Sequence, residues 1–179
     1  MNFNSTDIRY MQYALQLAKI SQGETWPNPA VGCVIVSNFT SKKKKPVIIG
    51  TGHTNKGGVP HAEIMAMNSA NKNLDGATLY VTLEPCCHIG KSDPCTQAII
   101  KNSLKRVVIA MVDPNPLVAG KGIQELKKNG VEVVVGCCES DAKEQNHGFI
   151  KRVTQNMPRI TAKLAVQKII SYVEKMIKE

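Results

Sequence analysis

The sequence predicts an α/β fold built on a five-stranded mixed sheet with helices on both faces. Five runs rich in apolar and β-branched residues have the length of buried strands: residues 30–38, 46–52, 77–83, 106–112 and 131–136. From the third run onward, these strands alternate with segments of helical periodicity. Such alternation is typical of parallel strands whose crossover helices cover both faces of the sheet.

The helical segments are recognised by periodicity and by their end signals. Helices are expected at residues 5–22, 61–71, 95–103 and 123–128. In the first of them, apolar side chains recur every three or four positions, Ser5 or Thr6 can cap the start, and Gly23 follows the end. The last of them stops at Gly130.

The first two strands form a hairpin in this prediction. They are separated by the lysine run at residues 42–45, which is expected to be an exposed turn, so the two strands should be antiparallel. The sheet is then mixed, with an antiparallel pair at the start and parallel strands after it. A second turn is expected at residues 113–116, directly after the fourth strand.

Composition indicates an ordinary globular chain of one domain. The chain has 179 residues, of which 42% are hydrophobic and 21% charged. It begins with no signal segment, and no apolar run approaches the roughly 18 residues of a membrane span, so a cytoplasmic location without membrane contact is expected. Thiols stay reduced there, which argues against disulfides among the six cysteines. The net charge of +9 suits a nucleic acid or a phosphorylated substrate.

A cluster of cysteines at residues 83–95 (LEPCCHIGKSDPC) indicates a metal site. It follows the stretch Pro60-His61-Ala62-Glu63, and the combination of H-x-E with a later P-C and a second cysteine is the signature of zinc deaminases. We expect zinc to be bound by His61, Cys86 and Cys95. Three protein ligands leave the fourth tetrahedral position open for water, as in a catalytic rather than a structural zinc site.

Glu63 is the candidate general acid–base residue. It lies two positions from a ligand, so it can sit beside the water without binding the metal and carry a proton to a leaving amine. All three ligands are expected at helix N-termini, where the helix dipole favours thiolate. Cys87 is the rival to Cys86, and the Pro-Cys register favours Cys86. The other thiols, Cys33, Cys137 and Cys138, are expected in the core or near the surface.

The loop between the two cysteine ligands resembles a family motif. It reads Pro85-Cys86-x-His88-x-Gly90-Lys91-x-x-Pro94-Cys95 and places eight residues between the cysteines. This resembles the long-loop motif of riboflavin-biosynthesis pyrimidine deaminases, whereas cytidine deaminases and tRNA adenosine deaminases place two residues there. Residues 28–32, 52–53, 60–63 and 113–122 match the same family. The similarity is to the deaminase half of the bifunctional riboflavin deaminase/reductase.

The resemblance implies a cytidine deaminase-like three-layer α/β/α fold and a defined enzyme activity. The implied reaction is the zinc-dependent, hydrolytic deamination of 2,5-diamino-6-ribosylamino-4(3H)-pyrimidinone 5′-phosphate. Its products are 5-amino-6-ribosylaminouracil 5′-phosphate and ammonia, and it is the second step of riboflavin biosynthesis. The implied partner is thus a small phosphorylated pyrimidine rather than a nucleic acid.

The resemblance also implies contacts to this substrate. Asn28 would offer its side-chain amide to polar atoms of the ring. The long loop would bring His88 and Lys91 over the pocket, where Lys91 offers a cation to the phosphate. Three further positions match family residues that hold the base, ribose or phosphate: His53, Asp113 and Asn115. The stretch 113–116 is also a good turn sequence in its own right, so a purely structural role stays open.

Two other functions fit part of the same pattern. A tRNA adenosine deaminase would share the fold, the zinc motif and the positive charge, but it lacks the long loop and has aromatic stacking surfaces that are not evident here. A non-catalytic, zinc-stabilised domain would keep the ligands. Glu63 weighs against that alternative, because a structural zinc has no need of it.

The last part of the chain is expected to be a separate tail. We assign residues 1–155 to the deaminase domain and residues 156–179 to a C-terminal tail. Residues 158–165 resemble the first strand of the family's reductase domain, and apolar residues between 166 and 176 recur at helical spacing. The amphipathic helix would pack on the domain or on another subunit, so a homo-oligomer is expected. These residues leave no room for a nucleotide-binding domain, so we expect either that a separate reductase acts downstream or that the chain is a piece of a longer protein.

Overall fold

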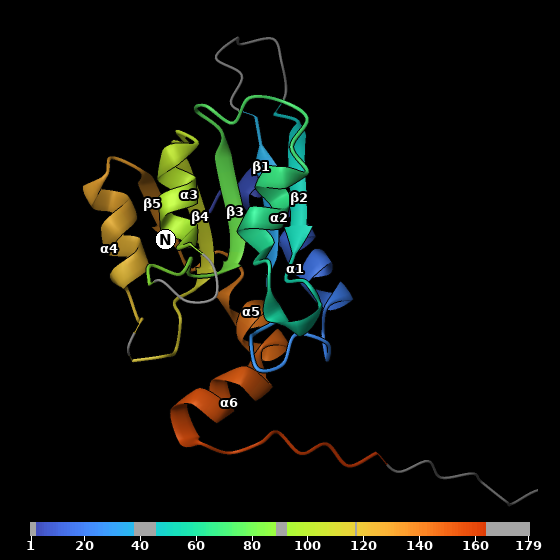
Figure 1. Cartoon of the computed structure of the whole chain (residues 1–179). Helices are drawn as coiled ribbons and strands as arrows, with labels where there is room; N and C mark the ends of the chain where they lie inside the picture. The colour runs from blue at the N-terminus through green and yellow to red at the C-terminus, as the bar shows by residue number, and fades with distance from the viewer. Residues whose placement is uncertain (1–2, 38–45, 89–92, 117, 164–179) are drawn as a thin grey trace, which may run out of the picture.

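The computed structural model describes residues 3–37, 46–88, 93–116 and 118–163. Within them, five strands make one sheet: β1 (Gly32–Val36), β2 (Ile48–His53), β3 (Thr78–Leu83), β4 (Arg106–Met111) and β5 (Glu132–Val135). The helices are α1 (Ser5–Ile20), α2 (Ala62–Asn68), α3 (Cys95–Lys101), α4 (Lys121–Lys128), α5 (Glu139–Gln145) and α6 (His147–Gln155), with a short 3₁₀ turn, η1 (Lys56–Gly58). Figure 1 shows their arrangement.

The sheet is mixed, as the sequence predicts. Its strand order is β2-β1-β3-β4-β5; β1 pairs antiparallel with β2 and β3, and β3, β4 and β5 run parallel. Consequently the carboxyl ends of β3 and β4 meet the start of β1 and the end of β2 at one end of the sheet. That end carries the loops that build the site described below.

Helices cover both faces, which confirms the predicted layers (Figure 1). On one face, α1 packs so closely on β1 that a Cβ at Gly32 would lie 1.9 Å from the carbonyl oxygen of Ala14. On the other face, α2 packs on β2, where a Cβ at Gly52 would lie 2.4 Å from the carbonyl oxygen of Ala62. Helices α3 and α4 continue this second layer, and α5 joins α1 in the first.

The core lies between these layers and is apolar. Strand and helix residues that are wholly inaccessible to solvent meet there, among them Met11, Ile35, Leu79, Ile109 and Leu126. Burying such side chains contributes about 1.5–3 kcal/mol each, which holds the strand ends of the site in fixed positions. Within the described residues, none of the helices is both long and apolar enough to cross a membrane.

A buried ion pair closes the end of the sheet opposite the site. Asp7, in the first turn of α1, accepts two hydrogen bonds from the Arg106 guanidinium, at 2.7 and 3.0 Å, and a third from the Tyr80 hydroxyl at 2.9 Å. Burial raises the pKa of Asp7, but these donors outweigh burial and hold its pKa below the ordinary value. This carboxyl is therefore ionised and fully partnered.

Two helices were not predicted from the sequence. The segments that form α5 and α6 are short and polar; α5 buries one residue, Ala142, and none of the described residues of α6 is fully buried. Segments of seven and nine residues are too short for periodicity alone to separate a helix from a loop. The lysine turn at 42–45 and the amphipathic segment at 166–176 lie outside the described residues. The described part of the tail, residues 156–163, contains no helix or strand.

Candidate active site

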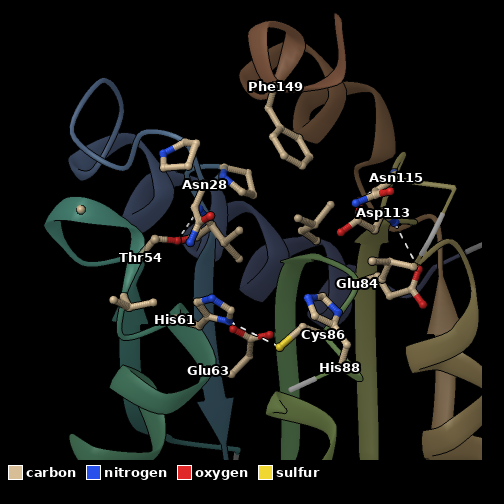
Figure 2. A pocket seen from close by; sticks show the side chains of 17 residues that line it. Asn28, Thr54, His61, Glu63, Glu84, Cys86, His88, Asp113, Asn115 and Phe149 are labelled. Atoms are coloured by element: carbon tan, nitrogen blue, oxygen red, sulfur yellow. Dashed lines mark hydrogen bonds between the residues drawn. The ribbon is translucent and has the colours of Figure 1, made fainter. Parts of the chain in front are cut away.

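The three predicted metal ligands converge at the carboxyl end of β3. His61 directly precedes α2, Cys86 lies in the loop after β3, and Cys95 is the first residue of α3. The Nδ1 atom of His61 lies 3.5 Å from Sγ of Cys86 and 3.4 Å from Sγ of Cys95. All three ligand atoms lie within 4.8 Å of one another (Figure 2 shows His61 and Cys86).

This geometry fits a zinc ion. Zinc takes thiolate sulfur at about 2.3 Å and imidazole nitrogen at about 2.0–2.1 Å in tetrahedral sites, which separates the two ligand atoms by about 3.5 Å. The observed separations match that value. Two thiolates and one imidazole are a zinc donor set, and three protein ligands are the number found in catalytic sites. Cys87 is not one of the three described residues that form this cluster.

The prediction that Cys86 lies at a helix N-terminus is wrong. Cys86 belongs to the long loop, because α3 begins only at Cys95. The first turn of α3 nevertheless supports it: the backbone N–H of Cys95 donates to Sγ of Cys86 at 3.3 Å, and that of Thr96 donates to the Cys86 carbonyl at 3.2 Å. The Cys95 amide thus stabilises the Cys86 sulfur, and the Thr96 amide holds the Cys86 backbone.

One of the two thiols carries the negative charge before metal binds. The hydrogen bond from the Cys95 thiol lowers the pKa of Cys86 well below its ordinary value, and hydrogen bonds from His61 and the Cys95 amide help to outweigh the opposing effect of burial. The same thiol–thiolate bond, together with burial, raises the pKa of Cys95. The cluster therefore offers one ready thiolate and one proton to be displaced by a cation, so zinc binding should release a proton.

Glu63 lies beside the cluster and is not part of it. It occupies the first turn of α2, is 4% exposed, and points into the same cavity as His61 and Cys86 (Figure 2). Burial, and next the negative charge of Cys86, raise its pKa to about 7. A carboxyl with this pKa can accept or release a proton near neutral pH, which is the requirement for general acid–base catalysis.

A cavity of about 310 Å³ opens above the cluster. Its described lining includes four of the residues that the sequence assigned to substrate: Asn28, His88, Asp113 and Asn115 (Figure 2). The Nδ2 atom of Asn28 donates to the Gly58 carbonyl at 2.9 Å, which fixes the amide at the rim. Oδ1 of Asp113 accepts the Asn115 N–H at 2.8 Å, so the predicted turn exists and faces the cavity.

Two predicted substrate residues are not placed in the cavity. Lys91 lies outside the described residues. His53 ends β2 at the correct end of the sheet but is not among the described residues that line the cavity. Side chains alternate along a strand, and Gly52 faces α2, so His53 faces the α1 side together with its register partner Gly32. A role for either residue stays a prediction.

Glu84 is a site residue that was missed. It is 3% exposed and accepts three backbone N–H groups: Oε2 from Asp113 at 3.2 Å and Gly120 at 2.9 Å, and Oε1 from Ile123 at 3.2 Å. It therefore ties the end of β3 to the loop after β4 and to the start of α4. The sequence did offer one signal for Glu84: an acidic residue stands between an apolar strand and Pro85. A carboxylate buried at such a position needs hydrogen-bond donors, which indicates a structural or functional role.

The remaining cysteines behave as expected. Cys33 and Cys137 are buried, and Cys138 is partly buried. Burial raises the pKa of each, so these thiols stay protonated and unreactive. Cys33 lies in β1 close enough to Glu63 for that charge to raise its pKa further. Their burial is consistent with structural roles.

Comparison with known proteins supports the same assignment. Residues 4–111 match the family described as the cytidine and deoxycytidylate deaminase zinc-binding region. The chain is 51% identical over 159 residues to the riboflavin biosynthesis protein RibD of Aquifex aeolicus, covering 89% of this chain but 43% of that protein. It is 45% identical over 152 residues to the diaminohydroxyphosphoribosylamino-pyrimidine deaminase of Buchnera aphidicola (subsp. Acyrthosiphon pisum), covering 85% of this chain and 99% of that one.

Solved structures show the same fold. RibD of Acinetobacter baumannii superposes with a TM-score of 0.76 at 49% identity, over 85% of this chain and 41% of the other. The chain thus spans less than half the length of the RibD proteins it matches and nearly the whole length of the Buchnera deaminase. The metal cluster, the adjacent carboxyl and these similarities agree: the chain belongs to the zinc-binding cytidine and deoxycytidylate deaminase family, and within it to the riboflavin-biosynthesis pyrimidine deaminases.

Proposed function

We propose that this chain deaminates 2,5-diamino-6-ribosylamino-4(3H)-pyrimidinone 5′-phosphate by hydrolysis. The observation that carries the proposal is the buried Glu63 beside the cluster of His61, Cys86 and Cys95, at the floor of a cavity of about 310 Å³. The Buchnera relative that the chain covers almost completely is named for a deaminase of this substrate type. Zinc, when bound by the three ligands, supplies Lewis-acid chemistry that activates water near neutral pH.

Glu63 moves the protons of this reaction. Water adds to C2 of the ring, forming a C–O bond, and Glu63 takes one of its protons. Glu63 then gives that proton to the ring amine, the C–N bond breaks, and ammonia leaves. Its position in the cavity, beside the three ligands, lets the same carboxyl make both transfers.

In this proposal, the substrate is oriented by polar residues at the rim of the cavity: Asn28, Asp113 and Asn115. The amide of Asn28 is held by the Gly58 carbonyl, and the turn of Asp113 and Asn115 is held by Glu84 and by its own hydrogen bond. These polar groups converge on the cavity from loops on opposite sides of it (Figure 2). They would contact polar atoms at the edge of the ring or on the ribose, while His88 and Lys91 serve the phosphate end.

A turnover assay tests this function against its alternatives. The zinc-loaded chain is supplied in parallel with the diaminopyrimidinone phosphate and with tRNA, and ammonia or inosine is measured. We expect ammonia from the pyrimidine and no inosine. Inosine alone would indicate an adenosine deaminase, and no product from either substrate would indicate a structural zinc site.

We further propose that the next, reductive step needs another protein. The Buchnera relative, which this chain covers over 99% of its length, is named as a deaminase. Adding NADPH to the assay and following absorbance at 340 nm should show ammonia release without NADPH oxidation. NADPH consumption by the pure chain would contradict this proposal. Self-association of the chain stays a prediction, to be measured by its mass in solution.

A further inference from the structure

Helix α6 is held against the site although it contributes little to the core. None of its described residues is fully buried, and it lies after residue 111, where the family match ends. Yet it is fixed to the loop that carries Asn28: the Nη2 atom of Arg152 donates to the Pro27 carbonyl at 2.7 Å, and the buried Nδ2 atom of Asn146, just before α6, donates to the Ala30 carbonyl at 3.1 Å. These bonds place α6 at the cavity mouth.

Phe149 is the residue that α6 brings to the cavity. Its ring hangs over the opening, across from His61 and Glu63 and between Asn28 and Asn115 (Figure 2). It is the one benzene ring among the described residues that line the cavity; the other apolar lining residues are aliphatic or proline. The side chain is only half-buried, so part of the ring is free to meet a ligand.

Arg152 holds this ring in place. Its guanidinium carbon lies 5.5 Å from the centre of the Phe149 ring and 5.1 Å from the centre of the Trp26 ring. Both distances are within the range of cation–π contacts. Since the same guanidinium bonds the Pro27 carbonyl, the Phe149 ring and the Asn28 loop are fixed relative to each other.

A planar heteroaromatic ring needs two kinds of contact in such a cavity. Its edge atoms are polar and are served by Asn28, Glu63 and the turn at residues 113–116. Its faces are best covered by apolar or aromatic groups, which bind a base by stacking. The cavity offers polar groups around its sides and Phe149 at its mouth.

We propose that Phe149 packs on the face of the substrate's pyrimidine ring. The inference rests on the proposed function and adds a specificity contact from a helix beyond residues 4–111, the part that matches the zinc-binding region. It predicts that α6 affects the binding of the ring and leaves zinc and the proton transfers alone.

The test compares Phe149→Leu with Phe149→Tyr in the zinc-loaded full chain, with Phe3→Leu as the matched control. Phe3 is also partly buried and, like Phe149, packs against the core, but it is not among the described residues that line the cavity. We expect Phe149→Leu to raise KM for the diaminopyrimidinone phosphate by about ten-fold with little change in kcat, and Phe149→Tyr to restore most of the affinity. Phe3→Leu should leave KM unchanged.

Inhibition by ribose 5-phosphate, which lacks the pyrimidine ring, distinguishes a loss of ring stacking from a general distortion of the cavity. Its inhibition constant should be the same for the parent chain and Phe149→Leu, and zinc content should be unchanged. An unchanged KM in Phe149→Leu, or an equal weakening of ribose 5-phosphate, would overturn the inference. Absence of ammonia from the parent chain would overturn the proposed function, and the inference with it.

Discussion

Two buried carboxyls at opposite ends of the same sheet have opposite surroundings. Asp7 receives hydrogen bonds from Arg106 and Tyr80, which hold its pKa below the ordinary value. Glu63 is equally buried, but it lies beside the Cys86 thiolate, and its pKa is raised to about 7. Both cost desolvation energy, and only Asp7 recovers it through an arginine.

The difference separates a stabilising charge from a reactive one. A buried acid with a cation partner strengthens the fold, whereas a buried acid beside an anion is strained electrostatically until a cation arrives. At the Glu63 end, the cluster of His61, Cys86 and Cys95 is the place for that cation. Perturbed pKa values gather at functional sites for this reason. The two ends should therefore respond to mutation in different ways.

Removal of a ligand should have the largest effect. Cys95→Ala leaves two ligands, so we expect most of the zinc and essentially all turnover to be lost. Metal analysis after dialysis measures the first and ammonia release the second. Cys87→Ala is the matched control, since its thiol is adjacent to Cys86 but outside the cluster, and it should keep its zinc. Full zinc in Cys95→Ala would disprove the ligand set.

Glu63→Gln should remove activity without removing metal. The amide cannot carry a proton, and general acid–base catalysis contributes about 10²–10⁴-fold to rate, so kcat should fall by that range. Zinc content should equal that of the parent. Glutamine resembles the protonated carboxyl in shape, so the free energy of unfolding should change little. Near-normal turnover would exclude Glu63 from the mechanism.

Asp7→Asn should lower stability with little change in activity, the reverse of Glu63→Gln. It leaves the Arg106 guanidinium, 23% exposed, without its closest anion, and we expect a loss of about 2–3 kcal/mol in the free energy of unfolding. Zinc binding and kcat should be close to those of the parent below the melting range. Glu132→Gln serves as control, because that side chain is 64% exposed and its ion pair with Arg106 should contribute about 0–1 kcal/mol. Equal effects of the two variants would contradict the comparison.

The two carboxyls should also give opposite pH dependence in the metal-free protein. The pKa of Glu63 is raised from 4.5 to about 7, so its contribution to stability is present below 4.5 and lost as pH rises through about 7. The pKa of Asp7 is lowered, so its contribution is present above 3.8 and lost as pH falls. Urea midpoints measured across pH should therefore decline less on the alkaline side in Glu63→Gln. Parallel curves for parent and variant would count against the raised pKa.

Lys91→Ala should have the smallest effect, because the lysine is expected to act through charge at the cavity mouth. We expect KM for the phosphorylated substrate to rise about five-fold, with the difference shrinking at high salt. Lys143→Ala, on the exposed face of α5, is the control and should change nothing. An equal loss on a dephosphorylated analogue would rule out a phosphate contact.

The end of the sheet that carries the metal was largely predictable from the sequence. The four residues lie at or beside the ends of strongly patterned strands and helices, so their convergence follows from the strand order: His61, Glu63, Cys86 and Cys95. The parallel half of the sheet was predictable for the same reason. Local sequence patterns were therefore enough to predict the position of a functional residue when that residue lies at the end of a strand or helix.

The rim was less predictable because it depends on packing between distant segments. The surroundings of His53 depend on which face of β2 it occupies and on which helix packs against that face. Glu84 gains its role only when the loop after β4 folds over it, and Phe149 belongs to a helix of nine residues, too short to be recognised from its sequence. Neither a register nor a docking position of this kind is encoded in a short motif.

Glu63 is proposed to direct water to the substrate, and isotope labelling tests that role directly. The zinc-loaded chain and its Glu63→Gln variant are each incubated with the diaminopyrimidinone phosphate in ¹⁸O-labelled water, and the product is examined by mass spectrometry. We predict one labelled oxygen per product molecule and an equal amount of ammonia from the parent chain, with almost none from the variant. Unlabelled product would contradict hydrolysis, and equal rates of labelled-product formation by both proteins would contradict the role of Glu63.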